Sequence, residues 1–284
     1  MFFINDNGAE MINNIQNNFS KYFDWVVMNN TFIKLKEVPN TVYAKIDFLP
    51  YFVNAVLPLI NNTFRLITAC SDYSPSVNFP NEYQIIINHP LLDVWYTNNK
   101  IHDHIKVRPL PAGLCNYPET YHNKLLDLYI KSYNTPKKNK ILCIWRHRDF
   151  NVCDPEYITR DKMKQFIHIY PEIFDWVEPN LNNEEFNNLL ITYKYILCPV
   201  GNGVDPSPKS FEAIATNTIP IMIASHNTRD AYKDLPCILV DNFEEVIVPG
   251  FLDNKVESLK DKLYNLNTLI KLSAVWWAHK IKSC

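Results

Sequence analysis

Short apolar runs that alternate with helical segments are the feature that most restricts the fold of this chain. Residues 41–46 (TVYAKI), 64–70 (FRLITAC) and 140–145 (KILCIW) have the length and the β-branched or aliphatic character of buried strands. Between the first two, 48–60 (FLPYFVNAVLPLI) predicts a helix interrupted by prolines. Strands buried on both faces and separated by helices are typical of parallel sheets. The sequence therefore predicts an α/β fold.

The same pattern continues through the rest of the chain and predicts two similar halves. Further strands are expected at 82–88, 104–111, 194–200, 218–225 and 237–243, and helices at 160–170, 182–193 and 256–281, the last of them broken near Asn265. Trp276 and Trp277 in that last helix are expected to be packing anchors. The polar stretch 134–140 (NTPKKNK) is interpreted as a linker. We expect an N-terminal domain over 1–135, a C-terminal domain over 136–265 and a terminal helix, 266–284, that packs back on the N-terminal domain.

Composition excludes several functional classes. The formal net charge is −2, so no overall positive field would attract nucleic acid or an anionic membrane. The seven cysteines are scattered without a C-x-x-C pair, which is typical of a reducing compartment. The N-terminus lacks the pattern of a signal peptide, and the longest apolar run is about half of a membrane span. A soluble, cytoplasmic protein with no membrane span is expected.

The segment 198–213 (CPVGNGVDPSPKSFEA) contains two of the only five glycines in the 284 residues. Gly201 and Gly203 would let the backbone adopt a positive φ or approach a ligand closely. A helix predicted to begin near Lys209 would point unpaired N–H groups at an anion in this turn. The pattern indicates a site for a phosphate or diphosphate, with Lys209 and Ser210 adding a cation and a hydroxyl.

Glu212, one turn into the same helix, could accept hydrogen bonds from the two hydroxyls of a ribose. The alternative is a plain helix start, with Ser207 as the capping residue and Glu212 stabilised by the helix dipole.

A second basic segment, 145–151 (WRHRDFN), follows the predicted strand 140–145 at its carboxyl end. Ligands bind at this edge in open α/β sheets. Arg146 and Arg148 would face the same side if the chain stays extended, and the guanidinium fork matches phosphate oxygens. A solvated basic turn is the alternative for this segment.

The run 193–223 resembles the donor-binding motif of exostosin-like glycosyltransferases, glycosyltransferase family 47, and of small viral or microbial relatives. In that motif a strand ending in C-P leads to a glycine turn, an S-x-R/K segment, a helix with an acidic residue and an I-P strand. The matching residues are Cys198, Pro199, Gly201, Ser207, Lys209, Glu212, Ile219 and Pro220. Lys209 replaces the usual arginine, and Asn217 replaces the usual glycine before I-P.

In the first half, FRLITACSDYS, HPLLDVWYTNN and HIKVRPLPAGLCNYPE resemble, in the same order, strands and turns of the family's acceptor domain. The resemblance implies a GT-B fold, in which two Rossmann-like domains face a cleft. It also implies an inverting transfer of a sugar from a UDP-sugar to a hydroxyl of a glycan acceptor, with xylose or another neutral sugar favoured.

Inversion by direct displacement needs a general base, for which the resemblance favours Asp72, with Asp47 as the alternative. No D-x-D metal motif occurs, so we expect no metal and no cofactor, with basic residues stabilising the leaving diphosphate. The expected donor-binding residues are Arg146, Arg148, Gly201, Asn202, Gly203, Asp205, Ser207, Lys209, Ser210 and Glu212.

Two other functional classes stay open. The segment 203–210 (GVDPSPKS) matches a P-loop except that Pro208 replaces the glycine next to the lysine, which removes an N–H from the phosphate cradle. A non-catalytic carbohydrate-binding protein could keep the same fold without turnover. His102, Asp103 and His104 could ligate a metal but lack a further ligand at suitable spacing, so a polar turn is favoured.

Overall fold

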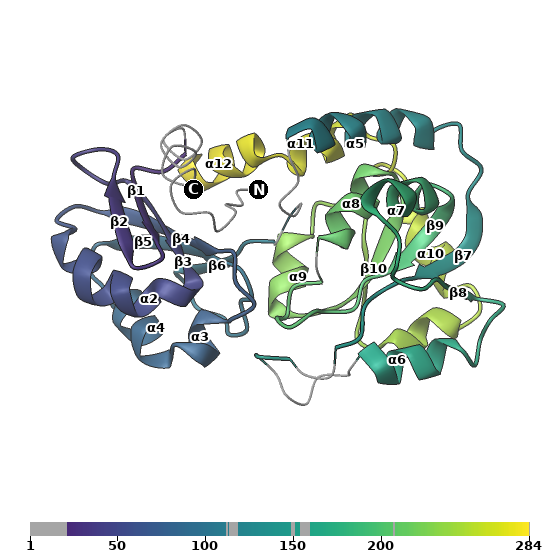
Figure 1. Ribbon diagram of the computed structural model, residues 1–284, viewed down its shortest axis with the longest axis horizontal. Coiled ribbons are helices and arrows are strands. Elements are labelled where there is room, and N and C mark those ends of the chain that lie inside the picture. The colour runs from purple at the N-terminus through teal and green to yellow at the C-terminus, as the bar shows by residue number, and fades with distance from the viewer. Residues whose placement is uncertain are drawn as a thin grey trace.

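The computed structural model describes residues 22–111, 113, 119–148, 151–153, 160–206 and 208–283, which form two lobes (Figure 1). Within these residues the first lobe is built on a six-stranded sheet of order β2-β1-β3-β4-β5-β6, and the second lobe on a five-stranded sheet of order β11-β10-β9-β7-β8. The strands of the first sheet are β1 Trp25–Met28, β2 Thr31–Lys34, β3 Thr41–Lys45, β4 Phe64–Ala69, β5 Leu92–Thr97 and β6 Val107–Pro109. Those of the second are β7 Lys138–Cys143, β8 Phe174–Trp176, β9 Tyr193–Leu197, β10 Ile219–Ile223 and β11 Ile238–Val240. Only the β1–β2 pair among them is antiparallel.

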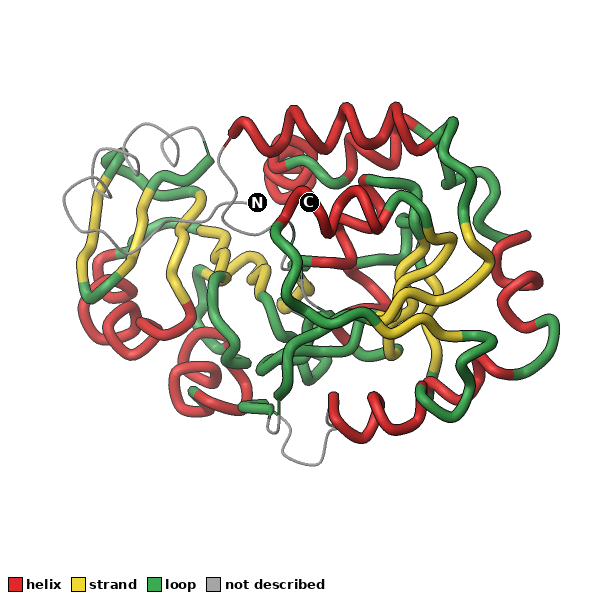
Figure 2. The backbone as a smooth tube through the Cα atoms, turned by 45° about the vertical axis from the view of Figure 1, so that its right-hand side comes forward, coloured by secondary structure: helices red, strands yellow, loops and turns green. Residues whose placement is uncertain are grey.

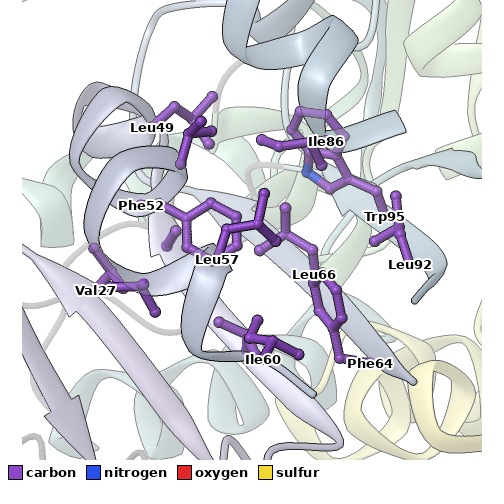
Figure 3. Close-up of a cluster of buried hydrophobic side chains, with 14 of the residues drawn as sticks. Val27, Leu49, Phe52, Leu57, Ile60, Phe64, Leu66, Ile86, Leu92 and Trp95 are labelled. Atoms are coloured by element: carbon purple, nitrogen blue, oxygen red, sulfur yellow. The ribbon is translucent and has the colours of Figure 1, made fainter. Parts of the chain in front are cut away.

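From β3 to β6 the strands lie side by side in the order in which they occur in the chain. Right-handed connections then place all crossover helices on one face of the sheet. These helices are α2 (Leu49–Tyr51), α3 (Pro75–Asn78) and α4 (Pro80–Ile87). Figure 3 shows Phe52 and Leu57 of the first crossover beside Leu66 of the sheet, and Trp95 of the sheet beside Ile86 of α4, in the core of this lobe.

Within the described residues, the opposite face of the first sheet receives no crossover helix and is covered instead by α12 (Ala274–Ser283). Trp277 and Ile281 of α12 are buried against Tyr43 and Ile67. Arg65 reinforces this contact, because its Nη1 atom donates to the main-chain oxygens of Ile281 (3.0 Å) and Lys282 (2.8 Å). The last helix of the described chain therefore completes the core of the first lobe, next to which it lies in Figure 1.

The second sheet has helices on both faces, as expected of a doubly wound sheet. One face is covered by α5 (Glu119–Ser132), α7 (Asn183–Leu190), α8 (Lys209–Ala215), α9 (His226–Ala231) and α11 (Leu266–Lys271). The other is covered by α6 (Arg160–Ile167), the short helical turn Phe243–Ile247 and α10 (Phe251–Glu257). The tube drawing turns this lobe toward the viewer (Figure 2). The helix α5 packs on α8 although it precedes position 135, so the predicted boundary there stays a prediction.

One predicted strand is wrong: 82–88 forms most of α4, a helix. Its three isoleucines favour a strand locally. Pro80 nevertheless occupies the first helical turn, where its missing N–H costs nothing, and Tyr83, Ile86 and Ile87 recur at helical spacing on the buried side. The sequence interpretation also missed the strands β1, β2, β5 and β8 and the helices α3, α5 and α9.

Most other elements were predicted correctly, within two or three residues for many of them. The proline-interrupted helix is confirmed as a series of short helical turns from Ile46–Phe48 to Leu57–Leu59, with a π-helical turn over Phe52–Val56. Pro50 and Pro58 each stand at the start of a turn, where the chain changes its hydrogen-bonding pattern. The terminal segment is broken as predicted, since Asn265 caps the start of α11. No helix in the described part of the chain is both long and apolar enough to cross a membrane.

Candidate functional site

The second sheet has a topological switch point between β7 and β9. From this pair the chain places β8 on one side and β10 and β11 on the other. In open α/β sheets, connections that leave in opposite directions open a crevice at the carboxyl ends of such a strand pair, where ligands bind. The loop after β7 contains Arg146 and Arg148, and the loop after β9 contains Gly201 and Gly203. The two segments singled out in the sequence therefore meet at the switch point.

Arg146 and Arg148 are both exposed in the loop after β7. Lys209 approaches the same loop from the first turn of α8 and donates to the main-chain oxygen of Ile144 at the end of β7. Burial, followed by the positive charge of Arg160, lowers the pKa of Lys209 to about 8. The negative charge of Glu212 raises the pKa of Lys209, but by less than burial and Arg160 lower it. Lys209 therefore lies in a positive environment.

Arg160 is a functional candidate that the sequence interpretation missed. At the start of α6, it donates from Nε to the main-chain oxygen of Val200 (2.9 Å) and from Nη1 to that of Arg146 (3.2 Å). It thus ties the loop after β7 to the loop after β9. Burial, followed by the charge of Arg148, lowers its pKa to about 10. A signal existed in the sequence, because an arginine opens the first helix predicted after the basic segment.

These four cations have no carboxylate partner in the described residues. We call Arg146, Arg148, Arg160 and Lys209 the cation cluster. None of the ion pairs of the described chain includes a member of it, although ion pairs form elsewhere on both lobes. Within the cluster, Arg160 lowers the pKa of Lys209 and Arg148 lowers that of Arg160. Like charges gathered without an ion-paired carboxylate would be relieved by an anionic ligand.

The glycine turn that follows β9 is held by the segment 151–153. Asn151 donates from Nδ2 to the main-chain oxygens of Gly203 (2.7 Å) and Gly201 (3.3 Å), and the Val152 N–H donates to that of Asn202 (2.7 Å). Neither glycine of this turn has a positive φ. A positive φ is therefore not the reason for glycine in this turn. The remaining reason for glycine at 203 is that other atoms lie too close for a Cβ.

The turn lies against the loop after β4 of the first lobe. A Cβ added to Gly203 would lie 2.7 Å from the main-chain oxygen of Asp72 and 2.7 Å from Oδ1 of Asn99. The same Asp72 oxygen accepts a hydrogen bond from Cys153 Sγ at 3.1 Å. At Gly201 an added Cβ would meet Arg160 only at 3.5 Å, an ordinary contact. The atoms that approach Gly203 closely thus belong to the first lobe.

Asp72, the favoured general base, lies at this junction. Its side chain is exposed, and Oδ2 accepts a hydrogen bond of 3.0 Å from Nδ2 of Asn202 in the glycine turn. The alternative, Asp47, follows β3 in the turn Ile46–Phe48. Its carboxylate lies 4.0 Å from Nζ of Lys45 and makes no hydrogen bond or ion pair with any described residue of the second lobe. The structure therefore brings Asp72, rather than Asp47, to the predicted donor residues.

Other predicted donor residues are buried. Ser210 is fully buried, and its hydroxyl is 2.9 Å from that of Tyr232. Glu212 is 2% exposed. Asp205 accepts a hydrogen bond of 3.2 Å from Asn227. Ser207 lies outside the described residues. Contacts from Ser207, Ser210 and Glu212 to a ligand therefore stay predictions.

The loop after β5 adds contacts between the lobes that the sequence did not reveal. Its Lys100 is 5% exposed, and Nζ lies 2.6 Å from Asp103 and 3.9 Å from Asp230 of α9. Asp103 in turn lies 2.9 Å from Nδ1 of His226, the first residue of α9. The turn that contains Asp103 thus makes polar contacts with the second lobe. In the part of the chain that is described, no group of three metal-ligating side chains occurs.

Comparisons with known proteins return little. No family model matches the sequence, and no curated protein matches it. Among solved structures, the chain is similar to a glycosyltransferase from Rickettsia africae ESF-5, at 12% sequence identity and a TM-score of 0.44, over 98% of this chain and 82% of that chain.

Proposed function

We propose that this protein is an inverting glycosyltransferase of the GT-B type, which moves a sugar from a UDP-sugar to a hydroxyl of a glycan acceptor. One observation carries the proposal. The cation cluster, without a carboxylate partner in the described chain, lies at the switch point of the second sheet, and the exposed carboxylate of Asp72 lies at the same junction from the other lobe. The resemblance of 193–223 to the exostosin-like donor motif supports the choice of reaction.

The cation cluster suits a diphosphate for two reasons. Arginine forks bind phosphate oxygens through paired, charge-assisted hydrogen bonds. The positive charge is also held in place before the reaction, by the hydrogen bonds of Arg160 and Lys209 to main-chain oxygens. Such preorganised charge stabilises a leaving group without reorganisation in the transition state. The proposal assigns the departing UDP to these residues and requires no metal.

Asp72 is the proposed general base. It takes the proton of the acceptor hydroxyl while the hydroxyl oxygen attacks the anomeric carbon and the bond from that carbon to the diphosphate breaks. Attack from the face opposite the leaving group inverts the anomeric configuration. A base must reach the proton that it removes, and Asp72 is exposed at the end of the loop that borders the glycine turn. The acceptor glycan would then lie on the first lobe.

The remaining assignments rest on the resemblance alone. They comprise UDP as the nucleotide, a neutral sugar such as xylose, and ribose recognition by Glu212. Cytoplasmic glycan assembly is the proposed setting.

The first test is isothermal titration calorimetry with UDP, GDP and ATP in the presence of chelator. We expect selective UDP binding by the wild type that weakens about tenfold or more in Arg148→Ala, since one charge-assisted contact is lost. Arg108→Ala is the matched control. Arg108 is also an exposed arginine that donates to a nearby main-chain oxygen, but it lies in the first lobe and should leave UDP affinity unchanged.

Other outcomes would favour the alternatives. Tight ATP binding that requires magnesium would overturn the proposal in favour of a P-loop protein. Selective UDP binding without transfer from any of a panel of UDP-sugars to glycan acceptors would indicate the non-catalytic carbohydrate-binding protein. Transfer with an inverted anomeric product, followed by NMR spectroscopy, would support the glycosyltransferase.

A further inference from the structure

Three loops from the two lobes meet at one side chain, that of Asn99. These loops follow β4 (71–73), β5 (98–100) and β9 (201–205). Asn99 belongs to the loop after β5, in the first lobe, and is 2% exposed. No role was predicted for it from the sequence.

The amide of Asn99 makes four hydrogen bonds. Nδ2 donates to the main-chain oxygens of Ser71 (2.9 Å) and Tyr73 (3.2 Å), on either side of Asp72. Oδ1 accepts from the main-chain N–H groups of Val204 (3.1 Å) and Asp205 (3.0 Å), directly after the glycine turn. A side-chain amide has two donor hydrogens and one carbonyl oxygen with two lone pairs. All of this capacity is used, and it is divided evenly between the two lobes.

Backbone geometry at two positions makes these contacts possible. Asn99 has a φ of +51°, in the left-handed region that asparagine adopts more readily than other residues with a side chain. Gly203 has no Cβ, and one added there would lie 2.7 Å from Asn99 Oδ1 and 2.7 Å from the Asp72 oxygen. The loop after β9 can therefore approach Asn99 only with glycine at 203.

We propose that Asn99 is a positioning residue, which fixes the loop containing Asp72 against the glycine turn and so sets the relative position of general base and donor. The structural part of this inference, that Asn99 clamps the two loops, is independent of the reaction. The positioning role rests on the proposed function. None of these four hydrogen bonds reaches a member of the cation cluster, to which the proposal assigns UDP, so the effect of Asn99 on UDP binding should be small.

Hydrogen exchange measured by mass spectrometry tests the clamp without any assay of activity. In Asn99→Ala, the amides of Val204 and Asp205 lose their acceptor, and we expect the peptide covering 200–206 to exchange about tenfold faster or more. The peptide covering 71–79 should also exchange faster, because the loop loses its two bonds to Nδ2.

Asn99→Asp separates the two halves of the clamp. The carboxylate still accepts from Val204 and Asp205, but it cannot donate to the Ser71 and Tyr73 oxygens and repels them. Protection should therefore fall at 71–79 and persist at 200–206. Because this substitution is nearly isosteric, it decides the question if Asn99→Ala fails to fold.

Asn98→Ala is the matched control. Asn98 is also a buried asparagine, 4% exposed, but its amide donates to Leu110 (2.6 Å) and accepts from Cys70 (3.2 Å), both in the first lobe. Protection at 200–206 should be unchanged in this variant. Unchanged exchange at both segments in Asn99→Ala would overturn the clamp, as would equal loss of protection at 200–206 in Asn98→Ala.

Kinetics then test the positioning role. With a UDP-sugar that the wild type turns over, Asn99→Ala should lower kcat about tenfold to hundredfold, since small displacements of reacting groups have effects of this size. The donor KM should stay within about twofold, and UDP affinity measured by calorimetry should not change. Equal losses in kcat and in UDP affinity would overturn the positioning role. Failure of the wild type to turn over any donor would contradict the proposed function, while the exchange result would still decide the clamp.

Discussion

The side-chain amide of Asn202 donates a 3.0 Å hydrogen bond to the carboxylate of Asp72, and this contact joins residues 130 positions apart in the sequence. Asn202 belongs to the glycine turn of the second lobe, and Asp72 to the loop after β4 of the first. An amide donor orients a carboxylate without adding a charge. The exposed Asp72 is thus held at the turn by a neutral partner.

Asp72→Asn should lower transfer activity about 10²-fold to 10⁴-fold, the usual contribution of a general base. Stability should change by no more than about 0.5 kcal/mol, because the side chain is exposed. UDP affinity should also be retained, since the cation cluster is intact. Initial rates with saturating donor measure the effect.

Asp47→Asn is the control for this experiment, because Asp47 is the alternative base. If Asp47→Asn abolishes transfer and Asp72→Asn does not, the assignment of the base is reversed.

The depressed pKa of Lys209 predicts how UDP binding depends on pH. Burial and Arg160 lower this pKa from an ordinary 10.5 to about 8. Lys209 therefore loses its charge as the pH rises through about 8, and affinity for UDP should fall by up to about tenfold per pH unit above that point. Calorimetry between about pH 7 and 9 measures this fall in affinity. Arg160 stays charged over this range, because its pKa is about 10. Lys209→Arg should remove the decline, and a decline that persists in this variant would contradict the assignment.

The lowered pKa of Lys209 has the opposite pH dependence for folding: stability rises with pH where UDP affinity falls. Between about 8 and 10.5 the unfolded chain holds the proton of Lys209 while the folded chain has released it. The contribution of Lys209 to the free energy of unfolding should therefore rise with pH across this interval. Chemical denaturation of the wild type and Lys209→Met at about pH 7.5 and 9.5 isolates this contribution.

The two glycines of the turn should respond differently to alanine. At Gly203 a Cβ would lie 2.7 Å from the Asp72 main-chain oxygen, and displacing it should cost about 1 to 3 kcal/mol. Gly201→Ala meets only a 3.5 Å contact with Arg160 and should change stability by no more than about 0.5 kcal/mol. Thermal and denaturant unfolding compare the pair. Equal destabilisation would show that the lobes do not touch at Gly203 in solution.

Trp277→Ala should destabilise the first lobe by about 3 to 5 kcal/mol, the usual cost of removing a buried tryptophan. Trp277 is 5% exposed and borders an apolar cavity between α12 and the first sheet, so its loss would enlarge an existing void. Val275 of the same helix is 68% exposed, and Val275→Ala should be nearly neutral. Denaturant unfolding distinguishes them, and a small effect at Trp277 would mean that α12 does not cover the sheet.

The sequence predicted those parts of the fold and site that depend on local pattern. The buried runs that became β4, β7 and β9 also located the loops with Asp72, Arg146 and Gly201, because function follows the carboxyl ends of parallel strands. The helix α4 was mistaken for a strand because its three isoleucines outweighed a proline start. Local preference cannot decide such cases when tertiary packing does.

Contacts between distant segments were beyond the sequence. Asn99 shows no local sign that it will bond Val204 and Asp205, more than a hundred positions away. The need for glycine at 203 was recognised, but its cause was assigned to a ligand, whereas the structure has the first lobe in that place. Ser210 looked like a ligand-binding hydroxyl in the sequence and is fully buried beside Tyr232 in the structure.

The covering of the first sheet by α12 also affects the order of synthesis and folding. Residues for one face of that sheet are made early, but Trp277 and Ile281, which bury the other face, leave the ribosome only after the entire second lobe. Nascent domains generally fold as units from the N-terminus. The first lobe therefore gains the cover that Trp277 and Ile281 give to Val26, Tyr43 and Ile67 only when the end of the described chain has been made.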